Sequence, residues 1–171
     1  MTSLRQAFEE THYIVYQPSL ILKIGLTNQP LDAMLQTAGC DCAAFITAWN
    51  PMCQALNSSE NQSRQQRLIH EIDGAGYKYL KGIGKHPSNN WPGEESILIL
   101  GISFADAKDL SQRHGQAAFV WHEISGETQL VPRWPVQIPP SVATPNSPRQ
   151  GQWNYDGSVL MASRLAASLS L

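Results

Sequence analysis

The alternation of apolar and polar positions predicts a chain that passes repeatedly between strands and helices. Short apolar runs bounded by turn-forming residues indicate strands, and apolar positions recurring every three to four residues indicate helices. The strands are predicted over residues 13–16, 20–24, 43–49, 77–83, 96–101, 117–122 and 128–131. The helices are predicted over residues 28–39, 59–76 and 103–115.

Capping residues delimit the predicted helices. Asn28 is expected to cap the first helix, and Gly39 is expected to end it. The segment that begins at Ser59 has the form of a capping box and opens the longest helix. Ser103 and Asp106 are placed to open the last helix in the same way.

The order of these elements predicts an α+β fold. We expect a two-layer sandwich, in which helices pack on one face of a mainly antiparallel or mixed sheet. The helices between strands could equally be crossovers of a mixed sheet, so the order of elements alone leaves the topology open.

Proline content divides the chain. Residues 1–131 are predicted to form a single α+β domain, because the apolar periodicity ends there. Six of the eleven prolines fall within residues 132–148, so residues 132–150 are predicted to be a proline-rich linker or arm. Residues 151–171 end in an apolar, alanine-rich run, which could form a short helix that docks on the domain, on a protein partner or on a second copy of the chain.

Composition and charge exclude several classes of function. Twelve basic and fourteen acidic residues give a net charge of −2, which attracts neither nucleic acid nor an anionic membrane, so neither partner is expected. The N-terminus lacks the pattern of a secretory signal. Three clustered cysteines suit neither a disulfide framework nor a metal site. We therefore expect a cytoplasmic protein with reduced thiols and without a metal or cofactor.

The longest predicted helix is polar where its apolar face begins. Asn61 and Arg64 lie on the same helical face as Leu68 and Ile72. Chain connection places them close to Asn50, at the end of the preceding strand. A helix N-terminus and a guanidinium group both favour anions, so the first hypothesis is a small-ligand-binding domain for an anionic metabolite or nucleotide.

Three alternatives stay open. Arg64 could instead pair with Glu94 or Glu95 and tie the loop before an apolar strand onto the helix. Partial burial could also raise the pKa of Glu94 or Glu95 and suit that residue to general acid or base catalysis, so the sequence does not decide whether the protein is an enzyme. A protein-interaction module that acts through the tail is the third hypothesis.

Four parts of the sequence stand out as an ordered set: residues 45–51, the pair Asn61 and Arg64, residues 94–102, and residues 115–121. Together they resemble a bacterial domain-of-unknown-function family, number 3293, over roughly residues 10–131. That family usually has Asn-Pro-any-Ser after the first of these strands, whereas this chain has Cys53 at the serine position.

The resemblance implies a bacterial, cytoplasmic protein and carries no activity across. It draws attention to Thr47, Asn50, Asn61, Arg64, Glu95, Ser96, Gln116 and Trp121. From the residues and the resemblance together, the predicted ligand-binding residues are Thr47, Asn50, Asn61, Arg64, Ser96 and Gln116. The catalytic candidates are Glu94 and Glu95.

Overall fold

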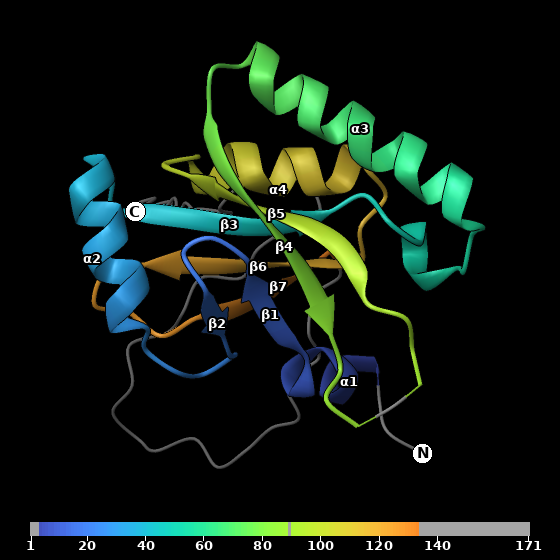
Figure 1. Ribbon diagram of the computed structural model, residues 1–171, viewed down its shortest axis with the longest axis horizontal. Helices are drawn as coiled ribbons and strands as arrows, with labels where there is room; N and C mark the ends of the chain where they lie inside the picture. The colour runs from blue at the N-terminus through green and yellow to red at the C-terminus, as the bar shows by residue number, and fades with distance from the viewer. Residues whose placement is uncertain (1–3, 89, 134–171) are drawn as a thin grey trace, which may run out of the picture. The chain divides into compact units, whose positions relative to one another are not determined.

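Seven strands form one sheet at the centre of the fold (Figure 1). The computed structural model describes residues 4–88 and 90–133. The strands are β1 (His12–Val15), β2 (Leu20–Leu22), β3 (Cys42–Thr47), β4 (Lys78–Lys85), β5 (Glu94–Leu100), β6 (Ala118–Glu123) and β7 (Gln129–Pro132). Their order across the sheet is β2-β1-β4-β5-β3-β6-β7, and all neighbours are antiparallel. The predicted α+β class is confirmed, and the sheet is antiparallel throughout.

The described helices agree with the three predicted from the sequence, with additions at the N-terminus and after β3. They are α1 (Leu4–Glu10), α2 (Gln29–Ala38), the single 3-10 turn η1 (Pro51–Cys53), α3 (Ser58–Gly74) and α4 (Phe104–Arg113). Helix α1 was not predicted, because it has neither an acidic first turn nor a buried residue to mark it. No helix in residues 4–88 and 90–133 has the length and apolarity to cross a membrane.

Side-chain caps begin the long helices. Asn28 Oδ1 accepts a hydrogen bond from Leu31 N at 3.1 Å, and Ser103 Oγ accepts one from Asp106 N at 3.1 Å, as predicted. The capping box predicted at residue 59 is wrong, because α3 begins earlier: Asn57 Oδ1 accepts from the backbone N–H three residues on, at 2.9 Å. An asparagine satisfies an orphan N–H as well as a serine does.

Helices cover both faces of the sheet, so the prediction that they pack on one face is wrong. Helices α3 and α4 pack against one face through residues that include Leu68, Ile72 and Leu110. Helix α2 packs against the opposite face through Leu31 and Leu35 (Figure 1). The physical reason is that the central strands carry apolar side chains on both faces, so other elements must shield each face from water.

Strand β3 shows this two-sided burial and sets the position of the site. Ala44 and Ile46 belong to the core under α3 and α4, whereas Ala43 and Phe45 belong to the core under α2. By the same alternation, Thr47 lies on the α2 face. The predicted end of the domain at residue 131 falls within β7, and the predicted linker and tail from residue 134 onward lie outside the described residues.

Candidate functional site

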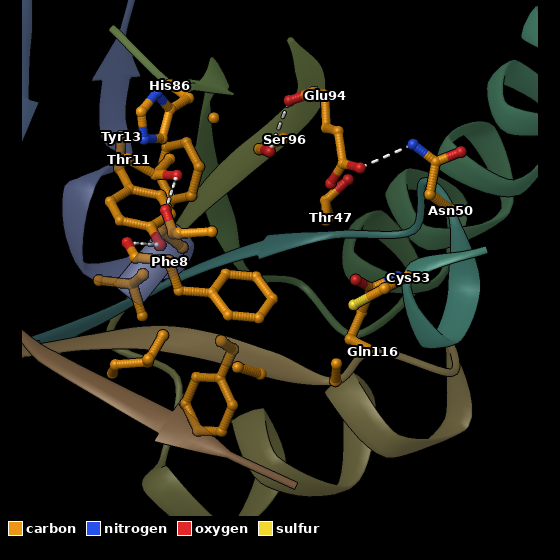
Figure 2. A pocket seen from close by; sticks show the side chains of 18 of the residues that line it. Phe8, Thr11, Tyr13, Thr47, Asn50, Cys53, His86, Glu94, Ser96 and Gln116 are labelled. Atoms are coloured by element: carbon orange, nitrogen blue, oxygen red, sulfur yellow. Dashed lines mark hydrogen bonds between the residues drawn. The ribbon is translucent and has the colours of Figure 1, made fainter. Parts of the chain in front are cut away.

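A cavity of about 320 Å³ opens on the sheet face that α2 partly covers, in the region that α2 leaves free (Figure 2). Helix α1 borders it on one side and η1 on the other. Most of its lining is apolar or aromatic. Thr47, Asn50, Glu94 and Gln116 form a polar end toward η1, whereas Thr11 and His86 lie on the side of α1 (Figure 2). The lining residues are Leu4, Ala7, Phe8, Thr11, Tyr13, Phe45, Thr47, Asn50, Cys53, Gly84, His86, Trp91, Glu94, Ser96, Gln116, Ala117, Ala118, Phe119, Val120 and Leu130.

Strand alternation decides which of the two adjacent carboxylates faces the cavity. Glu94 and Ser96 occupy alternate positions of β5 and both line the cavity. Glu95 lies between them, so its side chain belongs to the opposite face, and it is exposed. Of the two catalytic candidates predicted from the sequence, only Glu94 therefore reaches this site.

Hydrogen bonds hold Glu94 in place at the polar end of the cavity. Its Oε1 accepts from Asn50 Nδ2 at 2.6 Å and from Trp91 Nε1 at 3.2 Å (Figure 2). Burial raises the pKa of the Glu94 carboxyl, while the two hydrogen bonds act in the opposite direction and only partly offset it. The site thus contains a fixed carboxyl group with a raised pKa in a largely apolar setting.

The turn that carries Asn50 is strained. Asn50, Met52 and Cys53 have φ angles of 46°, 53° and 59°, in the left-handed region that non-glycine residues seldom adopt. Each such residue costs on the order of 1 kcal/mol, and such strain is concentrated at functional sites. The turn is held by Met52 N, which donates to Gly115 O at 2.8 Å, and by Leu56 N, which donates to Asn50 Oδ1 at 3.0 Å.

Asn61 supports this turn from α3 and does not line the cavity. Its Oδ1 accepts from Asn50 N at 2.8 Å, and its Nδ2 donates to Asn50 Oδ1 at 2.9 Å and to Leu56 O at 3.2 Å. The side chain is buried, with 2% of its surface exposed. Asn61 therefore fixes both the backbone and the side chain of Asn50, which in turn contacts Glu94.

Arg64 is also a supporting residue and pairs with neither Glu94 nor Glu95. Its Nε donates to Ala48 O at 3.0 Å, and its Nη2 donates to His114 O at 2.8 Å. These two carbonyls belong to the end of β3 and to the loop before β6. Arg64 thus joins three separate chain segments behind the cavity, and its polar atoms are directed at backbone.

Gln116 has both roles, because it lines the cavity and also fixes the end of β3. Its Nε2 donates to Trp49 O at 3.0 Å, and the side chain is 6% exposed. On α3, the buried Gln65 makes a similar contact, since its Oε1 accepts from Ala48 N at 2.9 Å. Most of the residues that the family resemblance singled out therefore lie around one end of β3. Trp121 does not, because it pairs with Ala44 toward the other end of the strand and belongs to the core under α3 and α4.

Thr47 and Ser96 line the cavity, and both hydroxyls are hydrogen-bonded to backbone. Thr47 Oγ1 donates to Glu95 O at 2.6 Å, and Ser96 Oγ donates to Glu94 O at 2.9 Å. Of the predicted ligand-binding residues, the structure brings Thr47, Asn50, Ser96 and Gln116 together at the cavity. The other two lie behind it.

Cys53 reaches the polar end of the cavity from η1 (Figure 2). Burial, and to a lesser extent the nearby charge of Glu94, raises the pKa of its thiol. Because the thiolate is the nucleophilic form, this environment does not activate Cys53. No group of His, Cys, Asp and Glu side chains in residues 4–88 and 90–133 is arranged to hold a metal ion.

The sequence did not predict the apolar part of the site. Phe8, Tyr13, Phe45 and Phe119 line the cavity, but along the chain they are indistinguishable from ordinary core positions. Tyr13 is held at one end by a hydrogen bond from its hydroxyl to Phe8 O at 2.8 Å (Figure 2). The one available signal was strand alternation, which places Phe45 on the same face as Thr47.

Comparison with known proteins confirms the family resemblance and adds no activity. A family model described as a protein of unknown function (DUF3293) matches residues 46–119. This segment contains η1, α3, β5 and α4, and so includes Asn50, Glu94 and the residues that support them. No curated protein and no solved structure matches the chain.

Proposed function

We propose that this chain, which carries a segment of a family of unknown function, binds a small and largely apolar molecule in the cavity, with Glu94 as the polar contact. The observation that carries the proposal is the pairing of an apolar cavity with one carboxyl group that Asn50 and Trp91 hold at its end. An apolar pocket with a few convergent polar groups is the usual form of a small-molecule site.

The size of the cavity limits the ligand. A volume of about 320 Å³ lies at the lower end of the range of about 300–1,000 Å³ for ligand pockets. Since one water molecule occupies about 30 Å³ of the liquid, the cavity has room for a molecule of about ten heavy atoms. A single aromatic ring with a short side chain meets this limit.

The aromatic lining favours such a ring. Phe8, Tyr13 and Phe45 contribute to the apolar part of the cavity, and aromatic side chains pack edge-to-face or offset against other rings. Tyr13 and Phe45 already pack edge-to-face, with ring centroids 5.5 Å apart. We therefore propose that the ring of the ligand lies among these side chains, while its polar group points to Glu94.

The experiment is an NMR titration of the full-length chain with 2-phenylethanol, a neutral probe of suitable size. Gly84 lines the cavity, and a Cβ added there would meet the nearest atoms, on Thr11 and Tyr13, at an ordinary 3.8 Å. The variant Gly84→Leu should therefore fold and fill the cavity with its side chain. Lys85→Leu is the matched control, because it adds the same side chain at the next, exposed position.

We expect 2-phenylethanol to shift the amide signals around the cavity in the wild type and in Lys85→Leu. In Gly84→Leu the affinity should fall at least tenfold while the denaturation midpoint is retained. Equal affinity in all three proteins would show that the probe binds elsewhere, and this result would refute the proposed function.

A second candidate is an enzyme in which Glu94 acts as a general acid or base. It is favoured by the raised pKa of Glu94, since an upward shift moves the pKa of a carboxyl toward the range in which general acids and bases work. The expected result is that Glu94→Gln abolishes turnover of a bound substrate but retains its binding, whereas Glu95→Gln has no effect. Turnover that survives in Glu94→Gln would exclude this role.

For the cellular setting, we propose the bacterial cytoplasm that the family resemblance implies. In keeping with a reducing compartment, Cys40, Cys42 and Cys53 are all free thiols in the described part of the chain. The predicted partner or second copy that binds the tail remains a separate proposal, since the tail lies outside the described residues.

A further inference from the structure

At the polar end of the cavity, more hydrogen-bond acceptors than donors are free to contact a ligand. Its hydroxyl donors are already committed to protein acceptors: Thr47 Oγ1 donates to Glu95 O at 2.6 Å, and Ser96 Oγ donates to Glu94 O at 2.9 Å. A hydroxyl has a single hydrogen to donate. Neither hydroxyl can therefore donate to a ligand without losing an existing bond.

The side-chain amides each have two hydrogens to donate. Gln116 Nε2 donates to Trp49 O at 3.0 Å and to His114 O at 3.5 Å. Asn50 Nδ2 donates one hydrogen to Glu94 Oε1 at 2.6 Å and keeps the other. Trp91 Nε1 also donates to Glu94 Oε1, at 3.2 Å. Apart from the Cys53 thiol, which is a weak donor, and the second N–H of Asn50, the side-chain donors at this end of the cavity are engaged.

Acceptors, in contrast, are left over. Within residues 4–88 and 90–133, no group donates a hydrogen bond to Glu94 Oε2 or to Gln116 Oε1, although both side chains line the cavity. The oxygen of Ser96 also has lone pairs that accept no hydrogen bond from this part of the chain. A ligand group that is rich in donors would satisfy these oxygens.

The charge of the cavity also disfavours an anionic ligand. Its described lining contains one carboxyl group, Glu94, and neither a lysine nor an arginine. Arg64 is the cation that the sequence predicted to bind a ligand, but it donates instead to two backbone carbonyls behind the site. The other titratable side chain of note, His86, contacts Glu10 at 3.0 Å on the side of α1. An anion placed at the polar end would face a carboxylate without a compensating cation.

From this inventory we infer that the ligand carries a cationic nitrogen head, an ammonium or amidinium group, which donates to Glu94 and Gln116 while its apolar body fills the cavity. The inference rests on the proposed function and specifies the class of ligand. It replaces the anionic ligand that the sequence predicted. Ammonium and amidinium groups are donors only, which matches a site whose free capacity is in acceptors. Aromatic walls also tolerate a cation, because a ring face attracts positive charge.

The test compares three probes that share one body and differ in the head group. They are 2-phenylethylamine, which is cationic at neutral pH, 2-phenylethanol, which is neutral, and phenylacetate, which is anionic. Each is titrated by NMR into the full-length wild type, Glu94→Gln and Glu95→Gln. Glu95→Gln is the matched control, because it removes the adjacent carboxylate from the opposite, exposed face. The denaturation midpoint of each variant verifies that it is folded.

We expect the wild type to bind 2-phenylethylamine about tenfold to a hundredfold more tightly than phenylacetate, as a charge-assisted hydrogen bond in a partly buried site would produce. Glu94→Gln should remove about tenfold or more of the affinity for the amine and leave the affinity for the alcohol within about threefold. Glu95→Gln should bind all three probes as the wild type does.

The outcomes separate this inference from the proposed function. If phenylacetate binds as well as the amine, or if Glu94→Gln retains the affinity for the amine, the cationic head is refuted while the cavity stands as a binding site. If none of the three probes binds to the wild type, the proposed function itself fails. A preference for the amine that disappears in Glu94→Gln alone establishes both.

Discussion

Replacement of Asn61 by alanine tests the support of the η1 turn. The buried side chain makes three hydrogen bonds, two to Asn50 and one to Leu56 O. At about 1 kcal/mol of net stabilisation each, their loss costs about 3 kcal/mol. Alanine returns about 0.5 kcal/mol through its higher helix propensity. We therefore expect Asn61→Ala to lower the free energy of unfolding by about 2.5 kcal/mol.

The assay is urea denaturation followed by circular dichroism, with Gln62→Ala as the control. Gln62 is the next residue on α3 and is exposed, so its replacement should change stability by no more than about 0.5 kcal/mol. Hydrogen exchange adds a local measurement: the amide of Asn50, which donates to Asn61, should lose protection in Asn61→Ala. A destabilisation below about 1 kcal/mol with unchanged protection would refute the supporting role.

Three further predictions concern stability. Asp32→Ala should lower the free energy of unfolding, measured by urea denaturation, by about 2–4 kcal/mol, because it removes the carboxylate that lies 2.8 Å from the fully buried His122. A decrease below about 1 kcal/mol would contradict this. Gly115→Ala should lower the free energy of unfolding by about 1–2 kcal/mol in the same assay, because φ of Gly115 is +71° and the new Cβ would lie 3.0 Å from Pro51 Cβ. Because burial raises the pKa of Glu94 above 4.5, the folded state binds its proton more tightly than the unfolded state. Its contribution to stability therefore falls as pH rises from 4.5 through the raised pKa, and Glu94→Gln should remove this fall from a series of denaturation curves measured between pH 4 and pH 8.

The elements that were predictable from the sequence are those with local signals. Helix α2 is an example, because Asn28 caps its start and Gly39, at φ 72°, ends it in the left-handed conformation. Such signals involve residues a few positions apart, so no knowledge of the fold is needed to recognise them. Helix α1 has no comparable signal, and its residues Leu4 and Phe8 serve the cavity instead.

The layering of the fold was mispredicted although the information was present. The run Ile97, Leu98 and Ile99 in β5 is apolar without alternation, and such a strand is buried on both faces. A sandwich with helices on one face would leave Leu98 exposed. The continuous run therefore required cover on both sides, and α2 supplies part of it, where Leu31 and Leu98 share one core.

The sequence predicted which residues lie near the candidate site but not what each of them does there. A polar residue on the core-facing side of a helix can have two roles. Such a residue can face a ligand, or it can satisfy backbone groups that would otherwise be buried without partners. Arg64 does the latter, and its acceptors Ala48 O and His114 O lie 16 and 50 positions away in the sequence. No local pattern reports such partners, so the sequence could rank Arg64 as a site residue and could not assign its role.

The division between supporting and facing residues explains why the ligand class that we propose differs from the anion that the sequence predicted. The sequence placed a guanidinium and a helix N-terminus at the site, and both would attract an anion. In the structure these donors have protein acceptors: Arg64 donates to two carbonyls, and the N-terminus of α3 donates to Asn57 Oδ1. What faces the cavity is the acceptor side of the same network. Because Glu94 Oε2 and Gln116 Oε1 accept no hydrogen bond from the described residues, while most of the donors beside them are engaged, the site proposed here would favour a ligand that donates.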